Sequence, residues 1–183
     1  MKLFWRTTCL VLLCLGLGTF PQASWGSRPL LGRPAPDFQV KSGDNQSLSL
    51  NMIRGKVIVL FYESRDAIKK NSPLKDELKR LYVTQPADVQ NNIFRLVVID
   101  CSEAFWPQTP IWKSKLKEHS RKEGFTIYGD WDQRMLADYQ LKPGDSNFLI
   151  IDKQGVIRYA AAHKIDNGQF EQIKDILFSL VQE

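Results

Sequence analysis

Cys101 is the side chain in this sequence best suited to covalent chemistry, because a cysteine thiolate attacks disulfides and peroxides. It follows residues 96–100, a mainly apolar run with the composition of a buried strand. The carboxyl ends of strands face the usual ligand crevice of an α/β sheet, so Cys101 is a candidate for single-thiol redox chemistry or an intermolecular disulfide. A free cysteine is also a common core residue, and we favour that interpretation.

A turn after a second apolar run offers charge rather than a thiol. Residues 57–62 have the composition of a buried strand, and a helical pattern follows them. Ser64 or Asp66 is expected to cap this helix, and a cap is the role we favour for Asp66, because an aspartate at a helix start accepts hydrogen bonds from free N–H groups. Alternatively, the basic residues here present positive charge to an anion or an acidic partner. The binding candidates at this turn are Ser64, Arg65, Asp66 and Lys69.

Two tryptophans, Trp106 and Trp112, lie in an aromatic segment that is rich in proline. Such a segment can form a lid over the edge of a sheet, which is the interpretation we favour. It can also form a contact surface, because exposed tryptophans are enriched at protein interfaces. Both tryptophans are therefore kept as binding candidates.

The sequence gives no support to metal, cofactor or nucleic-acid binding. It has no Cys-x-x-Cys, His-x-x-x-His or His-Glu-x-x-His spacing, so we expect no metal site and no cofactor. The net charge is +5, and the basic residues between Lys113 and Lys122 lie beside Glu118 and Glu123. This mixture is typical of a solvated helix face rather than a phosphate-binding patch. We expect a partner to be another protein and not a nucleic acid.

Residues 1–26 are predicted to be a signal peptide, which implies export to a periplasm or secretion. Lys2 and Arg6 precede an uncharged, mostly apolar run at residues 7–20, and small residues follow Pro21. The apolar run is shorter than the roughly 20 residues that span a bilayer, so no stable membrane span is expected after cleavage. A retained anchor or a buried N-terminal helix is the alternative.

Cleavage would leave Cys101 as the one cysteine of the mature chain, because Cys9 and Cys14 lie in the predicted signal. No intrachain disulfide could then form, although a Cys101-linked dimer could. The mature chain would carry 23 basic and 20 acidic side chains, a net charge of +3.

Residues 27–183 are predicted to form a single α/β domain. Continuous apolar runs are typical of strands covered on both faces, and amphipathic patterns predict helices between them. The order β-β, then β-α-β-α-β-α-β-β-α, predicts a mixed sheet between helices. Pro73 is expected to kink the first long helix. The expected strands are a hairpin within residues 38–50, then 57–62, 96–99, 125–128, 148–151 and 156–159, and the expected helices are 68–82, 111–123, 133–139 and 170–181.

Four segments resemble the redoxin superfamily, the peroxiredoxin and periplasmic thioredoxin-like group. Residues 32–38 are similar to the family's opening motif, and residues 53–62 to its central strand. Residues 130–141 resemble a later helix, and residues 148–157 the terminal hairpin. The resemblance implies a thioredoxin-like three-layer sandwich: a mixed central β-sheet flanked by helices, with an N-terminal β-hairpin extension.

The chain departs from that family at the two places that carry thiol chemistry. Where the family has its cysteines, this chain has Asp66 or Ala67 and Lys69 or Lys70, and residues 144–147 stand where thioredoxins have a cis-proline. The chain also resembles the cysteine-poor, YtfJ-type periplasmic proteins. The resemblance implies an exported redoxin-like binding or interaction module without thiol catalysis. The alternative is an atypical thiol-disulfide oxidoreductase that uses Cys101.

Overall fold

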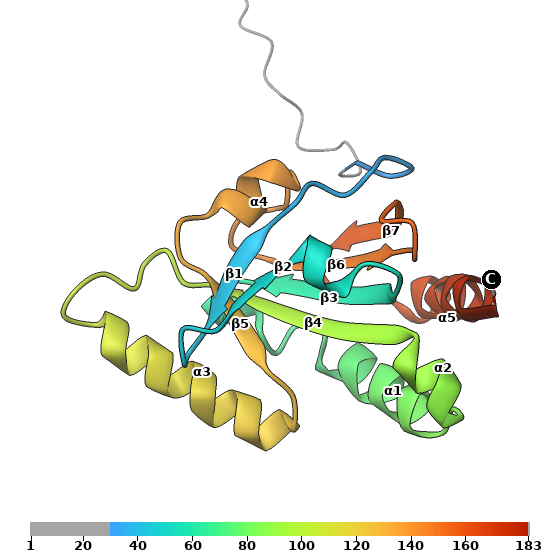
Figure 1. Ribbon diagram of the computed structural model, residues 1–183, viewed down its shortest axis with the longest axis horizontal. Helices are drawn as coiled ribbons and strands as arrows, with labels where there is room; N and C mark the ends of the chain where they lie inside the picture. The colour runs from blue at the N-terminus through green and yellow to red at the C-terminus, as the bar shows by residue number, and fades with distance from the viewer. Residues whose placement is uncertain (1–29, 183) are drawn as a thin grey trace, which may run out of the picture.

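The computed structural model describes residues 30–182, which form an α/β domain around one mixed sheet (Figure 1). The strands are β1 (Gln39–Ser42), β2 (Ser47–Ser49), β3 (Val57–Glu63), β4 (Ile93–Asp100), β5 (Ile127–Asp130), β6 (Ser146–Ile151) and β7 (Ile157–Ala162). Their order across the sheet is β2-β1-β5-β4-β3-β6-β7. β3 is parallel to β4 and antiparallel to β6, which confirms the predicted mixed sheet.

The helices cover the two faces of the sheet unequally. They are α1 (Ser72–Val83), α2 (Ala87–Asn91), α3 (Thr109–Glu123), α4 (Arg134–Asp138) and α5 (Asn167–Gln182), with the 3-10 turns η1 (Leu50–Ile53) and η2 (Arg65–Ala67). α1, α3 and α5 pack on one face, whereas α4 and the β1–η1 segment cover the other (Figure 1). All seven residues of β3 are buried, because its side chains alternate between the two covered faces.

The predicted N-terminal hairpin extends the sheet at one edge. β1 and β2 pair antiparallel, and β1 continues the sheet through Lys41, which lies opposite Gly129 of β5. The predicted fold class, including this extension, is therefore confirmed. The predicted signal peptide, residues 1–26, lies outside the described residues. None of the helices within residues 30–182 has the length and apolar character needed to cross a bilayer.

The first long helix starts later than predicted. After β3 the chain forms η2 and a short connection, and α1 begins only at Ser72. Pro73 therefore lies in the first helical turn, where its missing N–H removes no intrahelical hydrogen bond, and the expected kink is absent. The sequence pattern also missed α2, and it placed β5 two residues too early.

Candidate functional site

The carboxyl end of β3 lies beside the amino end of β6, and side chains from several segments meet there. Glu63 is in register with Ser146 across the two antiparallel strands. The turn that follows β3 is tied to the same place, because the Ser64 N–H donates to the carbonyl oxygen of Asp145 at 3.1 Å. The turn identified from the sequence is thus joined to residues 144–147, the segment that the sequence resemblance places where a thioredoxin cis-proline is expected.

Glu63 is fully buried, yet each of its carboxylate oxygens has a hydrogen-bond donor. Lys75 Nζ of α1 lies 2.5 Å from Oε2, and Ser146 Oγ lies 2.9 Å from Oε1. Burial raises the pKa of Glu63, while Lys75 and Ser146 act in the opposite direction. A buried carboxylate is tolerated only when it is paired and hydrogen-bonded, so this group fixes α1 against the end of β3.

Asn71 connects the same cluster to the segment after β7. Its amide nitrogen donates to Ser146 Oγ at 2.9 Å and to the carbonyl oxygen of His163 at 2.7 Å. Its side-chain oxygen accepts from the Ile165 N–H at 2.9 Å. Three hydrogen bonds therefore hold one buried amide, and they fix the position of the His163 backbone.

Three basic side chains surround the nearly buried carboxylate of Asp145. Its oxygens lie 2.5 Å from Lys70 Nζ, 3.5 Å from Lys142 Nζ and 2.6 Å from His163 Nδ1. Burial acts to raise the pKa of Asp145, but the hydrogen bonds from Lys70 and the Ser146 N–H, with the nearby charges, hold it below its usual value. Lys70, Lys142 and His163 are each more than a third exposed, so they form a basic rim at the surface.

The predicted binding residues of the turn take different positions. Arg65 and Asp66 form an exposed ion pair at 3.6 Å, and Lys69 is exposed. Ser64 points inward, and its hydroxyl oxygen is buried without a hydrogen-bond partner among the described residues. The expectation that Ser64 or Asp66 caps the helix is wrong, because Asp66 lies in η2 and Asn71 precedes α1.

Cys101 lies in the core just beyond β4. It is 1 % exposed and packs with Ile99 and Leu116. A Cβ atom added at Gly129 would lie 2.9 Å from the Cys101 sulfur, so the neighbouring strand closes over the thiol. Burial, followed by the charges of the acidic groups nearby, raises the pKa of Cys101 to about 12.

A second buried carboxylate, Asp130, lies at the end of β5. Its Oδ2 accepts hydrogen bonds from the Tyr62 hydroxyl at 3.0 Å and the Leu136 N–H at 3.2 Å. Within residues 30–182, its Oδ1 has no partner. Burial is the largest cause of the raised pKa of Asp130, and the neighbouring Asp132 adds to it.

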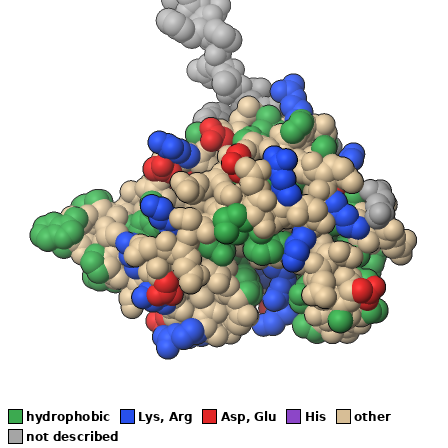
Figure 2. Space-filling model, viewed as in Figure 1, with side chains coloured by type: hydrophobic (Ala, Val, Ile, Leu, Met, Phe, Trp, Pro, Cys, Tyr) green, Lys and Arg blue, Asp and Glu red, His purple; other side chains and the backbone are tan. Residues whose placement is uncertain are grey.

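The aromatic segment forms a protruding loop in front of α3. Phe105 and Trp106 are 66 % and 82 % exposed, and Ile111 is also exposed. Figure 2 shows hydrophobic side chains gathered at this tip, on the left-hand side. Trp112 is half-buried instead, with the Arg65 guanidinium 5.8 Å from its ring centroid. The structure therefore brings Arg65 and Trp112 together and leaves Trp106 facing solvent.

Sequence reasoning missed the polar residues that form most of this site. Glu63, Asn71, Asp145 and His163 come from segments far apart in the chain, and no spacing motif links them. One signal was present: a glutamate directly ends a run of buried strand residues. Among the described residues, no group of three or more His, Cys, Asp or Glu side chains is arranged to hold a metal ion.

Comparison with known proteins gives the fold independent support. The model of the AhpC/TSA family matches residues 31–160. A putative thiol:disulfide interchange protein DsbE from Chlorobium tepidum superposes with a TM-score of 0.61 at 14 % identity, covering 82 % of this chain and 97 % of that one.

Two further solved structures extend this likeness. The exposed lipoprotein thioredoxin Etrx1 from Streptococcus pneumoniae has a TM-score of 0.57 at 16 % identity, covering 79 % of this chain and 100 % of that chain. A thiol peroxidase from Chromobacterium violaceum has a TM-score of 0.59 at 15 % identity, covering 84 % and 89 %. At these identities the likeness establishes a thioredoxin-like fold.

Proposed function

Because the chain belongs to the AhpC/TSA family, we propose that it is an exported redoxin-like module that binds a protein partner without thiol catalysis. The observation that carries the proposal is an ionic cluster beside the turn where the family resemblance would put a thiol. The end of β3 and the loop before β6 hold Glu63, Lys75, Asp145 and Lys70, and none of these side chains can exchange a disulfide.

The state of Cys101 supports a function without catalysis. Burial raises the pKa of Cys101 to about 12, so the thiol is protonated, and not a nucleophilic thiolate, at neutral pH. Its burial also keeps disulfide and peroxide substrates from the sulfur. The alternative, an atypical oxidoreductase that uses Cys101, requires the surrounding core to open first. The same burial disfavours a Cys101-linked dimer.

Two exposed features supply surfaces for a partner. The exposed loop residues Phe105 and Trp106 offer large apolar side chains, which are common anchors at interfaces. The exposed lysines of the basic rim, Lys70 and Lys142, offer positive charge. A partner with an apolar pocket and acidic groups would match this combination, because complementary charge favours association.

Export is part of the proposal and rests on residues 1–26. Their basic start, apolar run and small residues suit a signal peptide. The resemblance to the cysteine-poor, YtfJ-type periplasmic proteins supports this proposal, because this chain also has no cysteine in the turn after its central strand.

The first test measures thiol turnover. The wild-type chain and Cys101→Ser are compared for disulfide reduction and peroxide consumption with a thiol reductant. We expect neither protein to exceed the uncatalysed rate. Turnover by the wild type that Cys101→Ser abolishes would contradict the proposal and establish the oxidoreductase alternative. Non-reducing electrophoresis of the same samples should show a monomer in each lane.

The second test addresses the partner surface. Immobilised wild-type chain is used to capture proteins from the exported fraction of the source cells, beside Trp106→Ala and Met52→Ala. Met52 is the matched control, because it is an exposed apolar side chain on η1, away from the aromatic loop. A partner should be retained by the wild type and Met52→Ala but lost with Trp106→Ala. Equal capture by all three proteins would contradict a role for the loop.

A further inference from the structure

An apolar cavity of about 330 Å³ lies on the face of the sheet that α1, α3 and α5 cover. Its floor is formed by β4, where Ile93, Arg95 and Val97 are only half-buried although β4 is an inner strand. α1 and α3 stand apart here, and Figure 2 shows Lys and Arg side chains in the hollow between α3 and the α1–α2 pair. The helices thus leave part of the sheet uncovered.

Arg95 is the feature of this cavity that points to a ligand. Its guanidinium carbon lies 4.4 Å from the ring centroid of Tyr82 and 4.7 Å from that of Phe125. Within residues 30–182, no carboxylate pairs with the Arg95 guanidinium and no acceptor hydrogen-bonds to it, although the Arg95 backbone takes part in the β3–β4 ladder. Ring contacts hold the guanidinium in place, but they leave its five N–H donors free for an anion.

The charges around the cavity also favour an anion. Six cationic side chains line it against three carboxylates. Two of those carboxylates already have cations, Glu63 with Lys75 and Glu123 with Lys79. The remaining lining is largely apolar, including Trp112 and Leu177. The volume is within the range of small-molecule sites, which combine an apolar wall with a few polar groups.

We propose that this cavity binds a small amphipathic carboxylate of the fatty-acid class, with its carboxylate on Arg95 and its apolar chain along the floor between α1 and α3. A planar guanidinium matches the geometry of a carboxylate, and two parallel N–H···O bonds would satisfy the unpaired charge. The half-buried residues Ile93 and Val97 would contact the chain. This cavity is a second binding site, separate from the aromatic loop through which a protein partner is proposed to bind.

The test is calorimetric titration of the full chain with dodecanoate below its critical micelle concentration and with dodecanol below its solubility limit. The two probes share an apolar chain and differ in charge. We expect the wild type to bind dodecanoate at least tenfold more tightly than dodecanol, since a hydrogen bond to a charged group contributes about 1.5–3 kcal/mol. Arg95→Gln should remove that preference and leave dodecanol binding unchanged.

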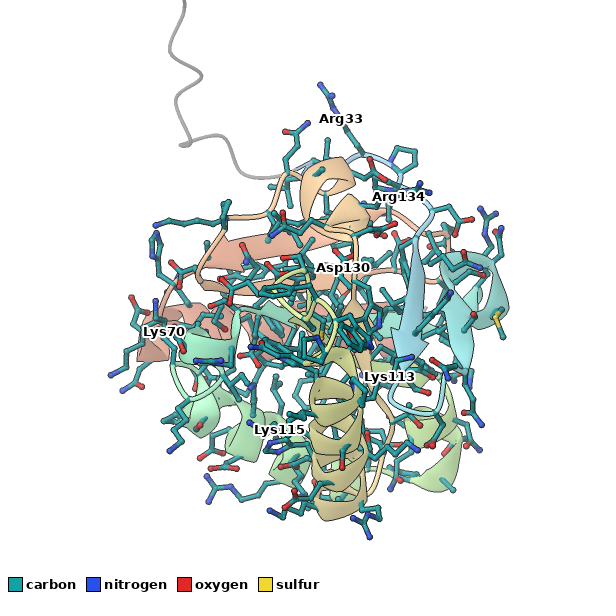
Figure 3. All side chains as sticks on the ribbon, turned by 90° about the vertical axis from the view of Figure 1, so that its left-hand side faces the viewer. Arg33, Lys70, Lys113, Lys115, Asp130 and Arg134 are labelled. Carbon is teal, nitrogen blue, oxygen red and sulfur yellow. The ribbon has the colours of Figure 1, made fainter. Side chains whose placement is uncertain are left out.

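Arg134→Gln is the matched control, because Arg134 is an exposed arginine on α4, across the sheet from the cavity. Figure 3 shows Arg134 and Lys115 of α3 at opposite sides of the sheet. This variant should bind both probes as the wild type does. A second variant, Val97→Phe, places a larger side chain on the floor and should weaken both probes while retaining the circular dichroism of the fold.

Three results would overturn the proposal. The first is equal affinity of the wild type for dodecanoate and dodecanol, and the second is unchanged dodecanoate binding by Arg95→Gln. The third is a stable dimer in sedimentation that Val97→Phe converts to a monomer, because the cavity would then be an interface between copies of the chain. Equal capture of a partner by the wild type and Trp106→Ala would contradict the proposed function but leave these ligand-binding results unaffected, so the two proposals fail separately.

Discussion

Replacing Lys75 with methionine should destabilise the protein by about 3 kcal/mol near pH 8, because it leaves the buried carboxylate of Glu63 without a counterion. Breaking one side of a buried ion pair costs about 3–5 kcal/mol. We expect the lower end, since Ser146 Oγ still donates to Oε1 at 2.9 Å and only Oε2 loses its donor. For a chain of this size the loss corresponds to a fall of about 6–12 °C in Tm.

The loss should shrink as the pH falls. Burial already raises the pKa of Glu63, and removal of Lys75 should raise it further. Above the unfolded pKa, the folded variant then binds more protons than the unfolded chain, so its stability decreases as pH rises through the folded pKa. Urea unfolding followed by tryptophan fluorescence at pH 5 and pH 8 measures both the loss and its pH dependence.

Lys79→Met is the matched control, because Lys79 lies one turn further along α1 and its partner Glu123 is exposed, 3.8 Å away. An exposed pair contributes at most about 1 kcal/mol. The double variant Glu63→Gln with Lys75→Met should recover part of the loss, because no charge is then buried alone. A loss below about 1 kcal/mol for Lys75→Met, or an equal loss at both pH values, would refute this account of the site.

Two further predictions concern the other buried groups. In a chain with Cys9→Ser and Cys14→Ser, Cys101 should react with a thiol reagent at least about 100-fold more slowly in the native state than in urea. The reason is that the native thiol is buried and its pKa is raised to about 12. Comparable rates in the two states would show that the core opens readily. Asp130→Asn should reduce the pH dependence of the free energy of unfolding. The pKa of Asp130 is raised in the folded protein, so the wild type loses stability as the pH rises from the pKa of this group in the unfolded chain to its pKa in the folded protein. Urea titrations of wild type and variant across this range test it, and parallel curves would contradict it.

The order and type of the elements could be predicted because they depend on local patterns. The apolar runs around Leu60, Val98 and Phe148 have the composition of strands buried on both faces, and the structure places them in β3, β4 and β6. The start of α1 could not be predicted well, because the apolar pattern begins at Ile68 although residues 68–71 form turns and the helix starts only at Ser72. Local periodicity does not locate helix ends to within a few residues.

The sequence by itself determined that this chain has the elements of a redoxin and has no cysteine between residues 14 and 101. Only the tertiary structure decided which side chains meet at the carboxyl end of β3 and where Cys101 lies. Glu63, Lys75 and Ser146 meet because the end of β3 lies beside the starts of α1 and β6, and the Arg95 guanidinium is left without a carboxylate partner because α1 and α3 stand apart over β4. Such contacts join residues distant in the chain, so they follow from packing rather than from any spacing along the sequence.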